Sequence, residues 1–541
     1  MFIREKKNKS GTISIQIISK KNGKYKVIET IGCAKDEINQ ELLVSIAKKR
    51  LKELEPTLFD TINTADEKEE ILGKKIENLN IDNDLIVSIG GELIFGKILK
   101  DIECEKYFQK IKIKNSKKRF EYFKDLVISR ILYPGSKLYL IDYLQIFKNK
   151  KISVYSIYRL LDKIYSTKLK DYLQECVFNH TMKLLDNKLI VSFYDVTTLY
   201  FESESEDDFR KIGFSKEGKL NRPQIQLGLL TTIQGYPLGY EVFEGNKFEG
   251  HTLIDSLKIF ENKFNLKSKP IIVADRGMLN DCNLINLDNN GYKYIIGAKI
   301  KILDSNLKNK IISFKFISDD DIKQITLNDD ILICNKKNSS KYSKTISHRL
   351  ILSYSTKRAK KDKYLRQKAF KNLKDKIDKN PNLTKSDLKS PYKKYLDLKS
   401  NSKITFKINE QKLSLDEKLD GIKGYMTNDF SLSKNDIISH YTNLSFIENA
   451  FKISKTDLEI RPIYHRLENR IKAHILISFI SYAVYKEFER RLNLSNTKFH
   501  FSKKIILDII KNIKAIQSDD SYKLFKFNKY QKMIYDAIFS L

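Results

Sequence analysis

The sequence predicts a mixed α/β fold that follows a largely helical region, and two patterns support this prediction. Apolar residues recur at helical spacing between residues 117 and 187, as in FEYFKDLVISRIL. From residue 189 onward, short apolar runs typical of strands alternate with amphipathic segments typical of helices. Strand pairs followed by alternating helices and strands imply a mixed sheet with helices packed on it.

Residues 1–100 are expected to form an N-terminal β-hairpin and helical region. The segments GTISIQII and YKVIETIG, between residues 11 and 32, alternate as paired strands do, and Asn22-Gly23 is a favoured hairpin turn dipeptide. From about residue 36 to 80 the pattern becomes charged and helical. The chain therefore opens with a small β unit.

Residues 101–187 are expected to form a helical, DNA-binding domain. Pro134-Gly135-Ser136 interrupts the helical pattern, and short helical segments follow it, as in a helix-turn-helix that reads DNA. An ordinary helical bundle explains the same pattern equally well. The sequence leaves both interpretations open.

Residues 188–300 carry the clearest α/β pattern. Two paired strands are expected in QIQLGLLTTI and PLGYEVFEGN, with a turn around Gly235. Helices are expected in TLIDSLKIFENKF and LNDCNLINLDNNG, and strands in LIVSFYD, PIIVAD and YKYIIGAKI. This part should form the first portion of the α/β core.

Residues 301–430 break this alternation and are expected to form a β-rich and lysine-rich insertion. Short alternating strands are expected in ISFKFIS, ITLNDDILICN and HRLILSYS. Between Lys357 and Lys399 there are 16 basic and 5 acidic residues. Such a run is either a solvated helix face or a surface that contacts phosphates.

Residues 431–541 return to a helical pattern and should hold the second portion of the core and the C-terminal helices. Ser433 and Asp436 form a helix-capping signal before IISHYTNLSFIENAFKISK, and Pro462 should end that helix. Residues 473–492 are strongly apolar, and the charges that closely flank them favour a core helix over a membrane-spanning one.

The composition favours a polyanionic partner, because 100 Lys and Arg residues against 68 Asp and Glu give a net charge of +32. Charge alone does not separate DNA from RNA or an acidic membrane. No apolar run approaches the roughly 20 residues that cross a bilayer, and the charged N-terminus shows no secretory signal. Five dispersed cysteines form no CxxC pair. We therefore expect a cytoplasmic protein with reduced thiols.

Three carboxylates are candidate metal ligands. Asp195 and Asp275 each end an apolar strand, and ligands gather at the carboxyl ends of strands in open α/β sheets. Glu448 shares one face of the predicted helix with Tyr441 and Lys455, because seven residues span almost two helical turns. The alternatives are turn or capping roles for the aspartates and an ion pair between Glu448 and Lys455. Three converging carboxylates would instead hold divalent cations such as Mg²⁺, and two ions suit in-line phosphoryl transfer.

These residues resemble the DDE transposases of bacterial insertion sequences, in the group with a Tyr-x2-Arg-x3-Glu-x6-Lys signature. YTNLSFIENAFKISK supplies Tyr441, Glu448 and Lys455 at the matching spacing, while Leu444 stands where the signature has Arg. The resemblance covers about residues 189–480. Other segments similar to the group are YDVTTLYFE, GFSKEGK, PLGYEVFEGN followed by Thr252, ADRGM, and LEIRPIYHRLENRIKAHI.

The resemblance implies an RNase H-like fold whose core is interrupted by the β-rich insertion. It also implies a transposase that cuts DNA at terminal inverted repeats and joins it to target DNA as a synaptic homodimer. Asp195, Asp275 and Glu448 would be the catalytic residues and would hold two Mg²⁺ ions, for which Mn²⁺ can substitute.

The same resemblance implies DNA-contacting residues around these carboxylates. Tyr441 and Lys455 would contact phosphate near the scissile bond. Arg276, Arg461 and His465 are weaker candidates, for which a surface or capping role fits equally well.

Two other functions remain open. One is an RNase H-like DNA nuclease, such as a resolvase, which cuts DNA but never joins it. The other is an inactive, domesticated DNA-binding protein, although all three carboxylates are present. In each case the expected partner is double-stranded DNA, the expected location is the cytoplasm at the nucleoid, and no membrane is involved.

Overall fold

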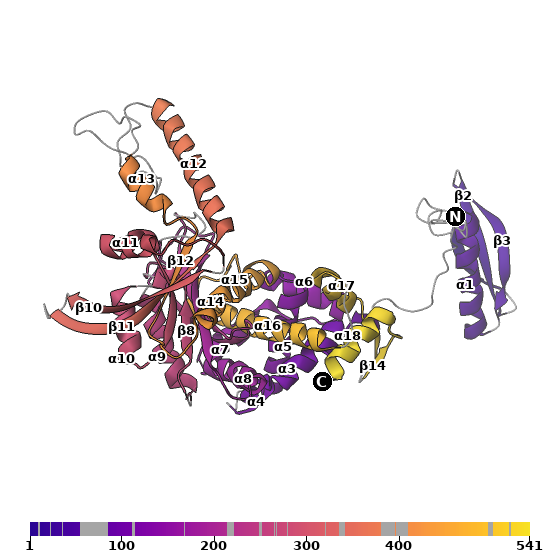
Figure 1. The fold of residues 1–541 in the computed structure, drawn as a ribbon. Coiled ribbons are helices and arrows are strands. Elements are labelled where there is room, and N and C mark those ends of the chain that lie inside the picture. The colour runs from indigo at the N-terminus through magenta and orange to yellow at the C-terminus, as the bar shows by residue number, and fades with distance from the viewer. Residues whose placement is uncertain are drawn as a thin grey trace. The chain divides into compact units, whose positions relative to one another are not determined.

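The computed structural model of the chain divides into two compact units, Met1–Asn83 and Asp84–Leu541 (Figure 1). The four predicted regions between residues 101 and 541 all fall within the second unit. The structure describes residues 1–8, 11–21, 23–34, 36–54, 85–110, 114–166, 168–213, 221–247, 251–264, 266, 268–278, 280–319, 321–334, 341–379, 395, 409–495, 501–518 and 521–540.

The first unit is a three-stranded antiparallel sheet with one helix. Its strands follow the order β1-β2-β3, and helix α1 contacts all three of them. The hairpin prediction is confirmed, because β2 and β3 pair directly and Gly23 takes the positive φ of 78° that the turn needs. Asn22 lies outside the described residues. The bounds are β1 Phe2–Lys7, β2 Ile13–Lys21, β3 Lys24–Ala34 and α1 Glu37–Leu54.

The second unit begins with a layer of helices. Ser136 caps the N-terminus of α6 by accepting a hydrogen bond from the Tyr139 amide, and this explains the break in the helical pattern there. Helices α3, α5, α7 and α8 all contact α16 from the far end of the chain, which is the packing of a bundle. A DNA-reading role for this region stays a prediction. The bounds are α3 Gly90–Asp101, α4 Cys104–Lys110, α5 Ser116–Leu132, α6 Lys137–Lys148, α7 Val154–Ser166, α8 Leu169–Leu184 and α16 Glu468–Leu494.

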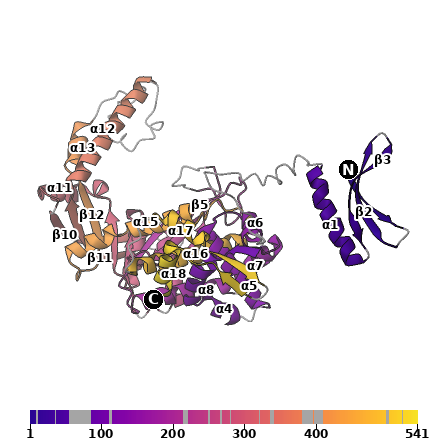
Figure 2. The ribbon, with the colours of Figure 1, turned by 90° about the vertical axis from the view of Figure 1, so that its right-hand side faces the viewer.

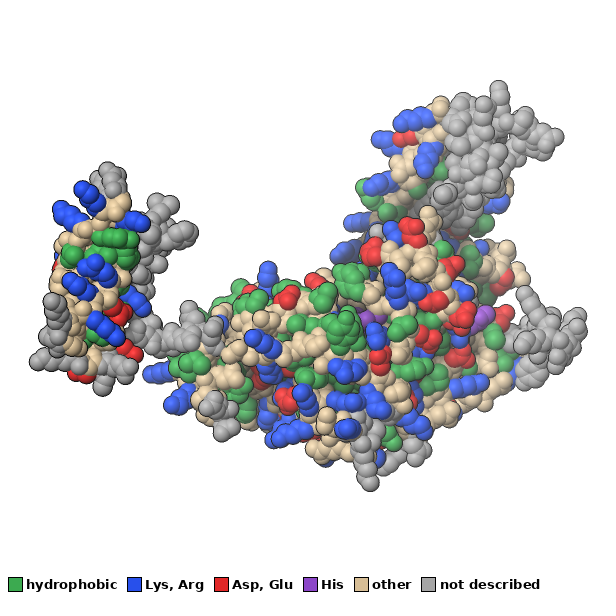
Figure 3. Space-filling model, turned by 180° about the vertical axis from the view of Figure 1, so that it is seen from behind, with side chains coloured by type: hydrophobic (Ala, Val, Ile, Leu, Met, Phe, Trp, Pro, Cys, Tyr) green, Lys and Arg blue, Asp and Glu red, His purple; other side chains and the backbone are tan. Residues whose placement is uncertain are grey.

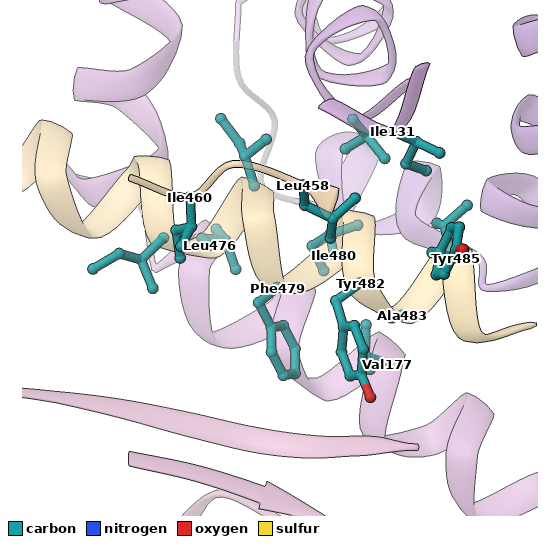
Figure 4. Packing of buried hydrophobic residues seen from close by; sticks show 14 of the residues in the cluster. Ile131, Val177, Leu458, Ile460, Leu476, Phe479, Ile480, Tyr482, Ala483 and Tyr485 are labelled. Carbon is teal, nitrogen blue, oxygen red and sulfur yellow. The ribbon is translucent and has the colours of Figure 1, made fainter. Parts of the chain in front are cut away.

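Helix α16 joins the helical layer to the sheet. Figure 4 shows Phe479 and Tyr482 pointing from this helix towards the strands, while Ile480 lies among side chains of the helical layer. The Phe479 ring lies 4.9 Å from the Tyr240 ring, and the Tyr482 hydroxyl donates to the Gly235 carbonyl at 2.6 Å. The expected core helix over 473–492 is therefore confirmed. No described helix is long and apolar enough to cross a membrane.

The central sheet has eight strands in the order β10-β11-β12-β9-β8-β5-β6-β7. The β5–β8 and β8–β9 pairs are parallel, and the other neighbours are antiparallel. The predicted β6–β7 hairpin is confirmed, with Gly235 at a φ of 80° in its turn. The bounds are β5 Val191–Tyr200, β6 Gln224–Thr231, β7 Pro237–Glu244, β8 Ile271–Ala274, β9 Tyr294–Ala298, β10 Ile322–Cys334, β11 Lys341–Tyr354 and β12 Ile422–Thr427.

Residues 301–430 contribute three strands to this same sheet. Strand β12 pairs with β9, β11 pairs with β12, and β10 pairs with β11, so the segment extends the sheet at one side. The strand predicted in ISFKFIS is wrong, because α11 occupies Ser305–Ser313 and no strand follows before β10. Helices α12 (Thr356–Lys379) and α13 (Glu410–Glu417) project beyond this part of the sheet in two views (Figures 1 and 2).

Helices cover both faces of the sheet. Residues Tyr194 and Val196 of β5 pack in one apolar cluster with α9 (Thr252–Phe264) and α10 (Asp281–Asn289). Residue Phe193 packs in the opposite cluster with α16 and the short helices after β12. This alternation fixes which side chains of β5 lie on which face.

The C-terminal residues fold back onto the start of the second unit. Strand β13 pairs with β4 on one side and with β14 on the other. Local patterns gave no sign of this pairing between residues more than 400 positions apart. The bounds are β4 Ile86–Ser88, α17 Lys503–Lys511, β13 Lys514–Ser518, β14 Ser521–Leu524 and α18 Lys529–Phe539.

Candidate active site

Asp195 and Asp275 lie on neighbouring parallel strands. Tyr194 of β5 is in register with Ala274 of β8, so the next residue of each strand is one of the two aspartates. Asp275 follows the last residue of β8, as predicted. Asp195 does not end its strand, because β5 continues to Tyr200 as the partner of β6. Antiparallel pairing with β6 therefore holds the backbone on both sides of Asp195.

Both aspartates belong to the same face of the sheet. Phe193 and Val273, two residues before each aspartate, pack in the cluster that contains α16. Tyr194 and Ala274 pack in the cluster on the opposite face. Because side chains alternate along a strand, Asp195 and Asp275 extend towards the α16 side. Asp195 is partly buried, and Asp275 is exposed.

A buried hydroxyl network holds β5 in place directly before Asp195. The Tyr194 hydroxyl donates to Oγ1 of Thr252 at 2.8 Å and accepts from Oγ of Ser256 at 3.1 Å, both on α9. All three residues are almost completely buried. Asp195 itself accepts a hydrogen bond from the Val196 amide through Oδ1 at 2.7 Å. Tyr194 and Thr252 therefore position the strand, and both belong to the segments that are similar to the DDE transposase group.

Tyr441 reaches Asp275 from α14 (Lys434–Thr442). Its hydroxyl donates to Oδ1 of Asp275 at 3.2 Å, and its ring meets the Tyr425 ring edge-on at 5.0 Å. Burial and the negative charge of Asp275 raise the pKa of Tyr441. Gly297 of β9 makes room for this side chain, because a β-carbon there would overlap the Tyr441 hydroxyl.

The helix expected to carry Tyr441, Glu448 and Lys455 is interrupted at Asn443 and Leu444, and its second part widens into a π-helix. Helix α14 ends at Thr442, α15 spans Ser445–Lys452, and a π-helix covers Ile453–Asp457. The three residues therefore do not share one face of a continuous helix, and that prediction is wrong. No helix passes the predicted stop at Pro462, because the last helical turn ends at Asp457.

Glu448 is exposed on α15. Its apolar neighbours Ile447 and Phe451 are buried, at 0% and 6% exposure, and they fasten the helix to the α16 side of the sheet. Helix α15 also contacts β5 directly. The Glu448 carboxylate stays in contact with solvent, because the helix turns its apolar side inwards.

Leu444 occupies the position of the signature arginine. It is the N-cap residue of α15, is 7% exposed, and packs in the cluster beside Ile447. Its apolar side chain therefore contributes to the attachment of α15. The predicted cap at the start of α14 is present, since Ser433 accepts a hydrogen bond from the Asp436 amide at 3.1 Å.

The candidate metal ligands are only partly assembled. Asp195 and Asp275 come together on adjacent strands, and Glu448 belongs to a helix that packs on the same face of the sheet. Among the residues that the structure describes, no group of three or more His, Cys, Asp or Glu side chains is arranged to hold a metal ion. The two aspartates are oxygen donors of the kind that hard divalent cations bind, and the carboxylate of Glu448 is exposed on α15.

The predicted DNA-binding side chains lie around this face. Arg276 is exposed beside Asp275, and its positive charge acts on Tyr441. Lys455 is partly buried in the π-helix. The guanidinium of Arg461 lies 5.4 Å from the centre of the ring of Tyr200, the last residue of β5.

His465 is packed between two aromatic rings. It meets the Tyr158 ring at 6.0 Å and the His474 ring at 5.8 Å. Burial, followed by the positive charges of Lys137 and Arg470, lowers the pKa of His465 to about 4. The imidazole is therefore neutral at neutral pH.

Residues 186–484, more than half of the chain, match the family described as "Transposase DDE domain". The chain belongs to the DDE transposase family. The matched residues include β5 to β9 with both aspartates, the three added strands, and α15 with Glu448. The GFSKEGK segment of the resemblance lies outside the described residues except for Gly213.

The other comparisons add little to this family assignment. A comparison with curated protein sequences finds no match. Among solved structures, the chain is similar to a piggyBac transposase determined by cryo-EM as a synaptic complex with hairpin DNA. The identity is 10%, the alignment covers 85% of this chain and 80% of that one, and the TM-score is 0.35. These values are too low to transfer any property of that complex to this chain.

Proposed function

We propose that this DDE transposase mobilises a bacterial insertion sequence, by binding its terminal inverted repeats, cutting the DNA there and joining the ends to a target. The proposal depends mainly on one observation: within the matched domain, parallel pairing of β5 with β8 puts Asp195 and Asp275 side by side on one face of the sheet. Paired carboxylates at adjacent strands suit metal-dependent phosphoryl transfer.

In this proposal Asp195, Asp275 and Glu448 form the catalytic trio. They would hold two Mg²⁺ ions, or Mn²⁺ in their place, and bound metal would activate the attacking oxygen and stabilise the leaving oxygen. Glu448 would complete the site when DNA and metal are bound, since α15 already packs beside β5. The sheet would then be an RNase H-like core, widened by β10 to β12.

The remaining candidates have positioning and binding roles. Tyr441 donates to Asp275 and would hold its carboxylate in one orientation. Arg276 and Lys455 would contact phosphates that flank the scissile bond. Arg461, which lies beside Tyr200 at the end of β5, would do the same. The large net charge of +32 favours binding to double-stranded DNA at the nucleoid. Two copies would act together on paired ends.

The test uses a linear duplex that carries the terminal repeats of the element. We expect cleavage at the repeat ends with Mg²⁺, no cleavage in EDTA, and strand transfer when pre-cut ends are supplied. The variants Asp195→Asn, Asp275→Asn and Glu448→Gln should each abolish cleavage and leave duplex binding within about twofold of the unsubstituted protein. The control is Asp208→Asn, a fully exposed carboxylate that lies 4.0 Å from the Lys211 ammonium.

Two results would reject parts of this proposal. Full cleavage by any one of the three variants would remove that residue from the catalytic trio. Cleavage without strand transfer from pre-cut ends would indicate a nuclease of this family rather than a transposase.

A further inference from the structure

Helix α12 (Thr356–Lys379) has an exceptional concentration of positive charge. It holds eleven basic and three acidic residues, a net charge of +8, which is a quarter of the +32 of the whole chain. Figure 3 shows Lys and Arg side chains along this projecting helix. The sequence from 380 to 408 adds seven lysines and two aspartates, so the surrounding chain does not balance the charge.

One face of α12 is anchored to the rest of the unit. Arg366, which is 4% exposed, pairs with Asp420 at 2.6 Å and with Glu417 at 3.0 Å. Asp362 accepts a hydrogen bond from the Gly421 amide at 3.2 Å, and Leu373 is buried. Asp362, the first acidic residue of the helix, therefore lies on the anchored face and not among the exposed lysines.

The opposite face of α12 is exposed and basic. Five residues form one stripe along this face, because they are spaced by four, three, four and three positions. They are Lys357, Lys361, Tyr364, Lys368 and Lys371. All five are exposed, and Tyr364 is 60% exposed. In the described part of the chain, no carboxylate forms an ion pair with any of these lysines.

Such a stripe weakens the isolated helix. Like charges three or four residues apart repel each other, and Lys357 with Lys361 and Lys368 with Lys371 are pairs of this kind. Basic residues in the first helical turn also oppose the helix dipole, and the first turn of α12 has no acidic residue. A polyanion bound along the stripe would relieve both effects.

We propose that this exposed face of α12 binds the phosphate backbone of duplex DNA, without regard to base sequence. A helix of 24 residues is about 36 Å long, close to one turn of a B-form duplex. Lysines supply point charges to phosphates, and this kind of contact carries no sequence information. The inference rests on the proposed function, since it identifies a surface of the protein that would bind the DNA substrate of that reaction.

The experiment measures duplex binding by the full-length protein in EDTA, so that catalysis does not contribute. The test variant carries Lys361→Gln, Lys368→Gln and Lys371→Gln. The matched control carries Lys523→Gln, Lys526→Gln and Lys529→Gln, which remove the same charge from exposed positions near the C-terminus. Both are titrated across a salt series with a terminal-repeat duplex and with an unrelated duplex of equal length.

We expect the test variant to lose about 2 to 3 from the slope of log affinity against log salt, at about 0.9 for each phosphate contact. The loss should be equal on the two duplexes. The control should keep the slope of the unsubstituted protein. A third variant with Lys→Arg at the three α12 positions should also keep that slope. The melting temperature of the Gln variant should equal or exceed that of the unsubstituted protein, because like-charge repulsion is removed.

Each other outcome has a definite meaning. A Gln variant with the slope of the control would overturn the inference while leaving the proposed function intact, and an acidic protein would then be the partner to seek. A loss confined to the terminal-repeat duplex would overturn the sequence-independent mode. If the unsubstituted protein bound neither duplex, the proposed function would fail as well.

Discussion

The hydroxyl of Tyr441 donates a hydrogen bond to Oδ1 of Asp275 at 3.2 Å, across 166 positions of sequence. This contact joins a helix that follows the added strands to the end of a central strand. It depends on Gly297 in the neighbouring strand β9, which leaves space for the phenol. The residues on either side of the added strands thus meet at one carboxylate.

Replacing Tyr441 with Phe should lower the rate of cleavage strongly and the free energy of unfolding only slightly. The substitution removes the donor that orients Asp275 and keeps the ring that packs on Tyr425. A single hydrogen bond contributes about 0.5–1.5 kcal/mol to stability. We expect the cleavage rate to fall about tenfold at saturating DNA, measured under single-turnover conditions.

The control for this variant is Tyr425→Phe. It removes the 3.3 Å hydrogen bond between the Tyr425 hydroxyl and Oγ of Ser353, which lies on the added strands and touches neither aspartate. Cleavage should be unchanged, while urea unfolding shifts by a similar amount. Equal rates for the two variants would mean that Tyr441 has only a structural role.

Gly297→Ala should destabilise the protein, because the new β-carbon would overlap the Tyr441 side chain. Overpacking of this kind costs about 1–3 kcal/mol. Gly96→Ala is the control, since nothing lies within 4 Å of a β-carbon at that position in α3, and it should stabilise the helix by up to about 1 kcal/mol. Urea denaturation of both variants would test this. If Gly297→Ala were as stable as the unsubstituted protein, the Tyr441 side chain would not lie against Gly297.

Tyr194→Phe should lower stability without changing the affinity for duplex DNA. The substitution removes the hydroxyl to which the buried Ser256 hydroxyl donates, and with it the hydrogen bond to Thr252. The expected cost is about 1–3 kcal/mol, because a buried polar group that loses its partner keeps its desolvation penalty. Chemical denaturation and a binding titration measure the two effects separately. A variant that lost affinity at unchanged stability would contradict this structural role.

Stability should fall as the pH is lowered from about 6.5 towards 4, and His465 should contribute to the fall. Its pKa in the folded state is lowered to about 4, so the unfolded chain binds the proton more readily in this range. The contribution is therefore fully present above the unfolded pKa and is lost below it, by at most about 3 kcal/mol.

The variant that tests this is His465→Phe, which keeps an aromatic ring between Tyr158 and His474. Its unfolding midpoint should depend less on pH between 6.5 and 4 than that of the unsubstituted protein. Some dependence should remain, because burial also lowers the pKa of His474. Identical pH profiles would rule out the proton linkage of His465.

Local patterns predicted many elements of the fold correctly. The β6–β7 hairpin and helix α9 were found because alternation and helical spacing both report burial along a single element. The helix break at Asn443 and Leu444 was missed for the same reason. Apolar residues continue at helical spacing through it, whereas α14 ends at Thr442 and α15 begins at Ser445.

The candidate site was predicted in its chemistry but not in its arrangement. The sequence by itself determined which residues carry carboxylates, which segments form strands and helices, and that the chain is strongly basic. The tertiary structure decided that β10 to β12 join the same sheet and that Asp195 lies within its strand. It also decided that Glu448 faces outwards. The physical reason is that periodicity records how one element is buried, whereas strand neighbours and shared faces are chosen by contacts between residues far apart in the chain.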